Sequence, residues 1–169
     1  MDRRYTAFRY FAYSLELLLL FILQTTPRLM PEILGSKPLL LLPAALTISY
    51  VESEIPAMFF GMASGILLDL GYGDNIGFFT FALTISCFFI SVIFRDNFVV
   101  SFLNATAFNS IFCAGLIFLY FLFFHVFAGK GSSLYYFFAH YFSRIIYTIL
   151  TGILLYYLNK YLSRSLRDN

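Results

Sequence analysis

Long apolar runs separated by short polar breaks are the dominant pattern along this chain. Runs such as "LELLLLFIL" and "LIFLYFLFF" do not alternate every second residue, so they favour helices over the strands of a membrane barrel. The runs recur at about the length that a helix needs to cross a bilayer, roughly 20 residues, and the fifth run is longer than one crossing needs. The pattern predicts an all-α, polytopic integral membrane protein with one transmembrane domain over residues 1–169. The six predicted transmembrane helices cover residues 8–25, 38–52, 55–70, 77–94, 98–128 and 134–162.

Composition supports a chain that faces lipid. The sequence is 60% hydrophobic and 21% aromatic, and only 12% of its residues are charged, against about a quarter in a typical soluble domain. The net charge of +2 is too small to suggest nucleic acid binding. Cys87 and Cys113 both lie inside apolar runs, so we expect free packing residues and no disulfide.

Basic residues predict the orientation of the bundle, because they collect on the cytoplasmic side of a membrane. With six crossings and a cytoplasmic N-terminus, more of them fall inside than outside. The inner group is Arg3, Arg4, Arg9, Arg95, Lys160, Arg164 and Arg167, and the outer group is Arg28, Lys37 and Lys130. We therefore expect both termini in the cytoplasm. The inner group could hold anionic lipid or contact an acidic protein surface.

The stretch "GILLDLGYGDNIGFF", Gly65–Phe79, interrupts this apolar sequence with glycines and acids. The third predicted helix is short, about 24 Å against a hydrocarbon core of roughly 30 Å, so the glycine-rich turn should lie partly at membrane depth. Gly61 and Gly65 form a small-xxx-small face that allows close contact between membrane helices. Asp69 is an acid inside the membrane and should have a partner, or else it caps the turn at the water boundary.

Small and weakly polar residues also form stripes on two of the predicted helices. Internal bundle packing and a docking groove for the transmembrane helix of a partner both explain such stripes. The fourth helix has Thr80, Thr84, Cys87 and Ser91, and the fifth has Ser101, Ala105, Asn109 and Cys113.

Two charges are predicted at nearly the same depth in the membrane. Glu16 lies about 12 Å from the inner surface and Arg144 about 15 Å from the outer surface, in a core about 30 Å thick. Because an unpaired charge at mid-membrane costs at least about 2.5 kcal/mol, we expect an ion pair between them. Asp69 is the rival partner for Arg144, and the alternative is that Arg144 extends alone toward the outer surface.

Motifs of catalysis are not found in the sequence. His125 and His140 stand alone, without the acid or second histidine of a metal site, and no nucleotide-binding or serine hydrolase motif occurs. We therefore expect a protein that is not an enzyme and that uses no cofactor or metal.

The segment "GMASGILLDLGYGDNIGFFTFALTI", Gly61–Ile85, resembles the signature of the rod shape-determining protein MreD family. That signature is a G-x-x-x-G helix with an acid near its end, a small polar turn, and a hydrophobic-Gly step into the next helix. The flanking segments "LLLFILQTTP" and "KPLLLLPAALTISYVE" are compatible with it, whereas the last two helices show no matching motif. The matching positions, which could pack helices or bind a partner, are Gly61, Gly65, Asp69, Gly73, Asp74 and Gly77.

The resemblance implies a scaffold of the bacterial cell-elongation machinery in the cytoplasmic membrane. Its implied partners are an MreC-like bitopic protein and, further out, an MreB-like filament and the polymerase and transpeptidase that build lateral peptidoglycan. The family is also similar in fold to the substrate-binding subunits of energy-coupling-factor vitamin transporters, which is the alternative function. Against that alternative, the first helix lacks the A-x-x-x-A docking face typical of such subunits. The Glu16–Arg144 pair is not implied by the resemblance.

Overall fold

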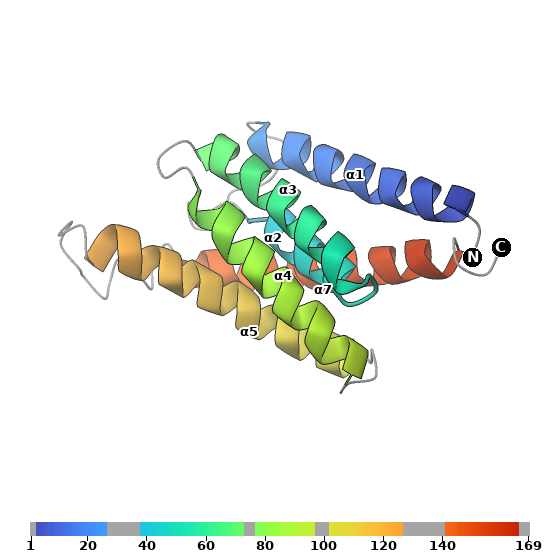
Figure 1. The fold of residues 1–169 in the computed structure, drawn as a ribbon. Coiled ribbons are helices and arrows are strands. Elements are labelled where there is room, and N and C mark those ends of the chain that lie inside the picture. The colour runs from blue at the N-terminus through green and yellow to red at the C-terminus, as the bar shows by residue number, and fades with distance from the viewer. Residues whose placement is uncertain (1–2, 27–37, 73–76, 97–101, 127–140, 166–169) are drawn as a thin grey trace.

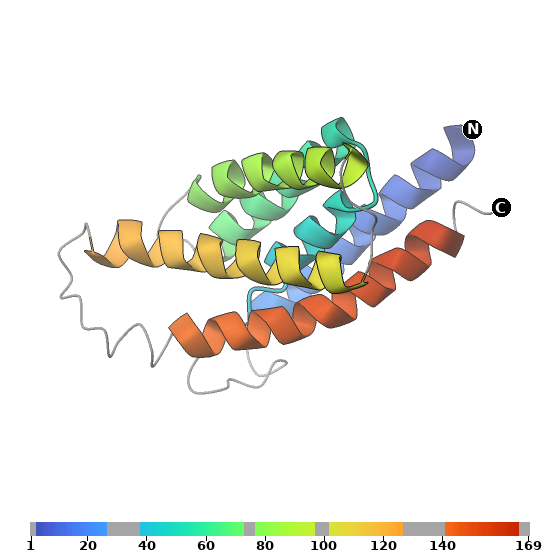
Figure 2. The same cartoon turned by 90° about the horizontal axis from the view of Figure 1, so that it is seen from below.

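A computed structural model shows a helical bundle and describes residues 3–26, 38–72, 77–96, 102–126 and 141–165 (Figure 1). Within these residues every regular element is a helix, which confirms the predicted all-α class for them. The elements are α1 (Arg3–Thr25), α2 (Leu41–Ser49), α3 (Glu54–Tyr72), α4 (Phe78–Asp96), α5 (Phe102–Phe121), the π-helical turn η1 (Leu122–Val126) and α7 (Ser143–Ser165). The start of α1 and the end of α7 lie at the same end of the bundle (Figures 1 and 2).

Four of the described helices are long and apolar enough to cross a membrane, and this supports a membrane protein. The spans are Thr6–Thr25, Glu54–Gly71, Phe78–Arg95 and Phe102–Phe124. The count of six crossings and the cytoplasmic location of both termini stay predictions. The outward faces of these helices are apolar, with Phe11, Phe59 and Phe81 each more than 60% exposed, as a lipid-facing surface requires.

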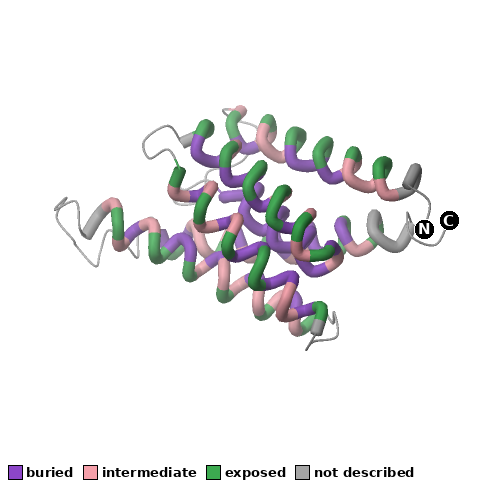
Figure 3. The backbone as a smooth tube through the Cα atoms, in the orientation of Figure 1, coloured by how far each residue is buried: buried purple, intermediate pink, exposed green. Residues whose placement is uncertain are grey.

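Helix α2 is the core of the bundle and is much shorter than the crossing predicted at residues 38–52. Its nine residues extend about 14 Å, which is less than half of the hydrocarbon core. All nine are buried, and α1, α3, α4, α5 and α7 all contact this helix (Figure 3). A helix that is hydrophobic on every side fits either lipid or a protein interior, and here protein surrounds it.

Helix α3 is three residues longer than the short crossing predicted at residues 55–70. It runs from Glu54 to Tyr72, or about 28 Å, which is close to a full crossing. The predicted helix ended at residue 70 because glycine and tyrosine there resembled the start of a loop. The short element is α2, and residues 73–76, part of the predicted glycine-rich turn, lie outside the described residues.

The last two helices complete the packing around α2. Helix α5 continues into the π-helical turn η1, so the long fifth run changes its hydrogen-bond register near Leu122. Helix α7 packs against α2 and α5 and carries Arg144, Asn159 and Lys160. The first part of the sixth predicted helix, 134–140, lies outside the described residues.

Candidate functional site

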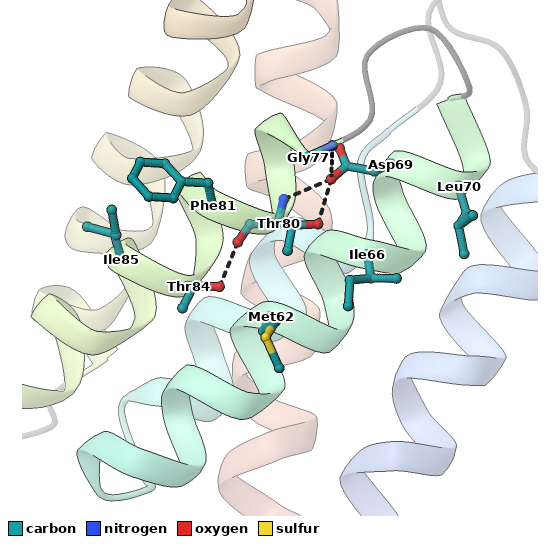
Figure 4. A pocket seen from close by; sticks show the side chains of 9 residues that line it. All are labelled: Met62, Ile66, Asp69, Leu70, Gly77, Thr80, Phe81, Thr84 and Ile85. Atoms are coloured by element: carbon teal, nitrogen blue, oxygen red, sulfur yellow. Dashed lines mark hydrogen bonds between the residues drawn. The ribbon is translucent and has the colours of Figure 1, made fainter.

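Asp69 caps the N-terminus of α4 from the end of the preceding helix. Its Oδ2 accepts hydrogen bonds from the backbone N–H of Gly77 at 2.9 Å and of Thr80 at 3.0 Å, and its Oδ1 accepts one from Phe79 N–H at 3.1 Å. The Thr80 hydroxyl donates to Oδ2 at 2.6 Å (Figure 4). The first N–H groups of a helix have no partner within it, and the helix dipole favours an anion there. Asp69 is 4% exposed, so this cap replaces water at a buried helix end.

Gly61 and Gly65 bring the backbones of α3 and α4 into direct contact. A Cβ added at Gly65 would lie 2.7 Å from the Phe79 carbonyl oxygen, and one added at Gly61 would lie 2.9 Å from the Leu83 carbonyl oxygen. Real Cβ atoms do not approach backbone so closely, so both positions require glycine. The small-xxx-small face predicted from the sequence is therefore occupied by α4 of the same chain.

Gly77 directly precedes α4 and needs glycine for a different reason. Its φ is +103°, a conformation that L side chains rarely adopt, and nothing lies within 4 Å of an added Cβ. Glycine is needed here for its backbone conformation, whereas Gly61 and Gly65 are needed for space. Gly73 and Asp74, the other two positions of the predicted motif, lie outside the described residues.

The polar stripes of α4 and α5 face mostly into the bundle. Cys87 is fully buried against Gly61, and the Ser91 hydroxyl donates to the Glu52 carbonyl oxygen at 2.7 Å. On α5, Asn109 is 3% exposed and lies against Gly152 of α7. These contacts match internal packing, the first of the two interpretations of the stripes. Ser101 lies outside the described residues.

Glu16 is placed with Asn159 and away from Arg144, which differs from the predicted ion pair. The Asn159 amide donates to Glu16 Oε1 at 3.2 Å and to the Thr47 hydroxyl oxygen at 2.8 Å, so it joins α1, α2 and α7. Arg144 precedes Asn159 by about 22 Å of helix axis. Depth along the membrane was a poor guide, because the polar group that reaches Glu16 is a buried asparagine amide, which donates to one of its two carboxylate oxygens. The guanidinium of Arg144 lies 5.9 Å from the centre of the Tyr141 ring.

A second set of polar contacts, which the sequence analysis missed, attaches α1 to the core. Arg9 binds Glu52 through Nε at 2.7 Å and Nη2 at 3.0 Å, and the Gln24 side-chain oxygen accepts from Leu41 N–H at 3.3 Å. Together with Glu16, these residues follow one face of α1, about two turns apart. That spacing was visible in the sequence and was the signal that could have revealed them. Their partners could not be found, because α2 was taken for a crossing.

The described residues do not contain a candidate metal centre. Among them, no group of three His, Cys, Asp or Glu side chains could hold a metal ion. The side chain of His125 and the whole of His140 lie outside the described residues.

Three apolar hollows lie on the outer surface of α3. Two run along the boundary with α4: the first, of about 420 Å³, is lined by Met62, Ile66, Asp69, Leu70, Gly77, Thr80, Phe81, Thr84 and Ile85 (Figure 4). The second, of about 270 Å³, is lined by Ile55, Met58, Phe59, Met62 and Thr84. The third, of about 460 Å³, lies between α1 and α3 and is lined by Ser14, Leu17, Leu18, Phe59, Phe60, Ala63, Ile66 and Leu67.

Comparison with known proteins adds no relative. No family model matches the chain, and neither a curated protein nor a solved structure matches it.

Proposed function

We propose that this chain is an integral-membrane scaffold of the bacterial cell-elongation machinery, of the MreD kind, which works by binding other proteins. The observation that supports this proposal most is the Gly61–Ile85 segment, whose pattern resembles the signature of that family. Gly61 and Gly65 provide space for the contact between α3 and α4, Asp69 caps α4, and Gly77 adopts the positive φ at the start of α4. The resemblance thus falls on residues that determine the shape of the molecule.

The use of Asp69 also favours a scaffold over a carrier of ions or protons. An acid inside a membrane protein is commonly part of a transport pathway. Here both carboxylate oxygens accept hydrogen bonds from the start of α4, so the charge serves to fix one helix against another. The surfaces that the four membrane-compatible helices offer are apolar helix faces, which suit lipid and the transmembrane helices of partners.

The partner that this proposal places first is an MreC-like bitopic protein in the cytoplasmic membrane. An MreB-like filament and the elongation polymerase and transpeptidase are further members of the assembly. Both termini are proposed to be cytoplasmic, which would place the exposed Arg95 at the inner surface.

Depletion of the protein in its host tests the proposal. Because lateral peptidoglycan synthesis would lose its scaffold, rod-shaped cells should become round within a few generations, and a plasmid copy of the wild-type gene should restore rods. Rods that persist after clean depletion, in a host with no second copy of the gene, would refute the proposed function.

A further inference from the structure

Glu16, Thr47 and Asn159 form a buried polar cluster that joins α1, α2 and α7. Glu16 is 8% exposed, and the other two residues are each 1% exposed. The Asn159 amide nitrogen has two hydrogens and uses both, one toward Glu16 Oε1 at 3.2 Å and one toward the Thr47 hydroxyl oxygen at 2.8 Å. The Thr47 hydroxyl itself donates to the Ala44 carbonyl oxygen at 2.8 Å. The side-chain donors of the cluster are therefore all in use.

Two buried oxygens of the same cluster have no hydrogen-bond partner among the described residues. They are Glu16 Oε2 and Asn159 Oδ1, and both can only accept if the carboxyl group is ionised. Buried acceptors without a donor are rare and costly in folded proteins. The two oxygens belong to groups that already share one hydrogen bond, and an amide and a carboxyl group joined in this way place their remaining oxygens side by side when they are coplanar.

No cation is paired with Glu16 within the described residues. Arg9 lies about 10 Å earlier along α1 and is paired with Glu52. On α7, the amine of Lys160 donates to the Tyr156 hydroxyl oxygen at 3.3 Å. An ionised Glu16 would therefore have one neutral amide as its partner in the described part of the chain.

The other groups around Glu16 are uncharged. Tyr13, one turn earlier on α1, packs its ring edge-on against Phe60 of α3, with 5.5 Å between the ring centres. Tyr50, at the end of α2, packs against Phe94 of α4. The α3 residues that line the hollow against α1 are apolar, and they are Phe59, Phe60, Ala63, Ile66 and Leu67. A carboxylate in such surroundings has a high free energy.

We propose that Glu16 is a proton-binding site, and that its carboxylic acid forms a pair of hydrogen bonds with the Asn159 amide. The proton sits on Glu16 Oε2 and is donated to Asn159 Oδ1, while the Asn159 N–H group continues to donate to Oε1. One hydrogen atom thus gives both buried oxygens a partner and removes the charge from the interior of the bundle. The bound proton holds α1 and α7 together.

A water molecule or a metal ion fits the same place less well. A water can donate to both oxygens, but it leaves the carboxylate charge inside the bundle. Hard metal ions such as Mg²⁺ and Ca²⁺ take about six or more oxygen ligands, whereas this cluster offers the two unpaired oxygens of Glu16 and Asn159. The proton is the one ligand of the three that needs no further partner.

Infrared difference spectroscopy tests the proton directly. The protein is purified at neutral pH in a detergent without ester groups, because a protonated carboxyl gives a carbonyl band above the amide region and a carboxylate does not. We expect this band in the wild type and its complete loss in Glu16→Gln, which has the same shape and cannot ionise. A difference spectrum that shows a carboxylate band and no protonated carbonyl band would overturn the proposal, and would indicate an ionised Glu16 beside a water or a metal ion.

Isotope labelling makes the measurement independent of how a variant folds. Wild-type protein that contains glutamate labelled with ¹³C at the side-chain carboxyl should show the same carbonyl band at a lower frequency. Glu52 and Glu54 are paired with arginines, so their carboxylates do not contribute a protonated band. The absence of any labelled carbonyl band in the wild type would refute proton binding at Glu16.

A matched pair of substitutions tests the partner of the proton. Asn159→Leu removes the amide, so the carbonyl band should move to higher frequency as the Glu16 carboxyl loses its hydrogen bonds. Asn109→Leu makes the same change at a buried asparagine of α5 whose side chain lies against Cys113 and Gly152, and the band should stay in place. An unmoved band in Asn159→Leu would overturn the pairing of the acid with this amide.

Discussion

Helices α3 and α4 touch along their backbones, whereas α1 is tied to its neighbours by long polar side chains at three levels. In the first region, Gly61 and Gly65 remove side chains so that carbonyl oxygens and Cα atoms meet. In the second region, Arg9, Glu16 and Gln24 extend from α1 to partners in or near α2 and on α7. The first contact depends on space, and the second depends on charge and hydrogen bonds.

The comparison shows two different ways to hold a helix in a membrane, where hydrophobic burial gives no preference for protein over lipid. Close packing without side chains gains dispersion energy along the whole contact. Polar side chains instead stabilise a contact because a donor or a charge left unpaired in hydrocarbon has a high free energy. Added side-chain volume should therefore destabilise the α3–α4 contact most, and loss of a charge or hydrogen bond should destabilise the contacts of α1 most.

Loss of charge in α1 should lower the free energy of unfolding the most. Arg9→Gln removes the cation from the Glu52 carboxylate, whose side chain is 3% exposed, and breaking such a buried pair costs about 3–5 kcal/mol. The exposed pair between Arg95 and Glu54 provides the matched control, because Arg95 is 60% exposed and Arg95→Gln should cost no more than about 1 kcal/mol. Denaturant unfolding in detergent micelles measures both, and equal losses would contradict the assigned difference in burial.

Added side-chain volume between α3 and α4 should cause the second largest loss in the free energy of unfolding. Gly65→Ala forces a methyl group against the backbone of Phe79, and overpacking of this kind costs about 1–3 kcal/mol, here toward the upper end since backbone must move. Gly115→Ala on α5 is the control, because nothing lies within 4 Å of its added Cβ and alanine favours a helix by up to about 1 kcal/mol. Thermal unfolding of the two variants side by side would refute the close contact if Gly65→Ala were no worse than Gly115→Ala.

Loss of the cap on α4 should have a smaller effect that is graded by chemistry. Asp69→Ala leaves the first N–H groups of α4 without their acceptor and should cost about 2 kcal/mol. Asp69→Asn keeps one oxygen acceptor and should lose about half as much. Hydrogen exchange at Phe79 and Thr80 provides the specific readout: it should accelerate in both variants, most in Asp69→Ala. Unchanged protection of these two amides would show that Asp69 is not the cap.

The smallest effect is expected at the contact between α1 and α7. Asn159→Leu removes hydrogen bonds to Glu16 and Thr47, each worth about 0.6 kcal/mol in membrane proteins, so about 1 kcal/mol should be lost. In a double-mutant cycle, Glu16→Gln with Asn159→Leu should lose less than the sum of the two singles. Glu16→Gln with Arg144→Gln should be additive, and coupling in that second cycle would restore the ion pair first expected from depth.

The sequence predicted the long helices well and their partners poorly. Continuous apolar runs identified α1, α3, α4 and α5 to within a few residues, because lipid-facing helices need about 20 apolar residues whatever they contact. The same rule failed for α2, since its nine residues are equally apolar but face protein on every side. Asp69 was recognised as needing a partner. Its partners are backbone N–H groups at the start of α4, 8 to 11 residues later in the sequence, and composition cannot identify a backbone partner. Glu16 was assigned to a cation, although its hydrogen-bond partner is the neutral amide of Asn159.

The account of the α3–α4 pair depends on the two helices forming one closely packed unit, and Gly61→Cys tests that contact most directly. The new Cβ would lie 2.9 Å from both Cys87 Cβ and the Leu83 carbonyl oxygen, so α3 and α4 have to separate by about 1 Å to accept it, and this shift brings the two Cβ atoms to the roughly 3.5–4.5 Å separation of a disulfide. After mild oxidation in the membrane, denaturation and labelling with a maleimide of known mass, the protein should keep one free thiol, that of Cys113. Gly115→Cys, treated in the same way, should keep all its thiols free. Full labelling of Gly61→Cys after oxidation would contradict the contact between α3 and α4.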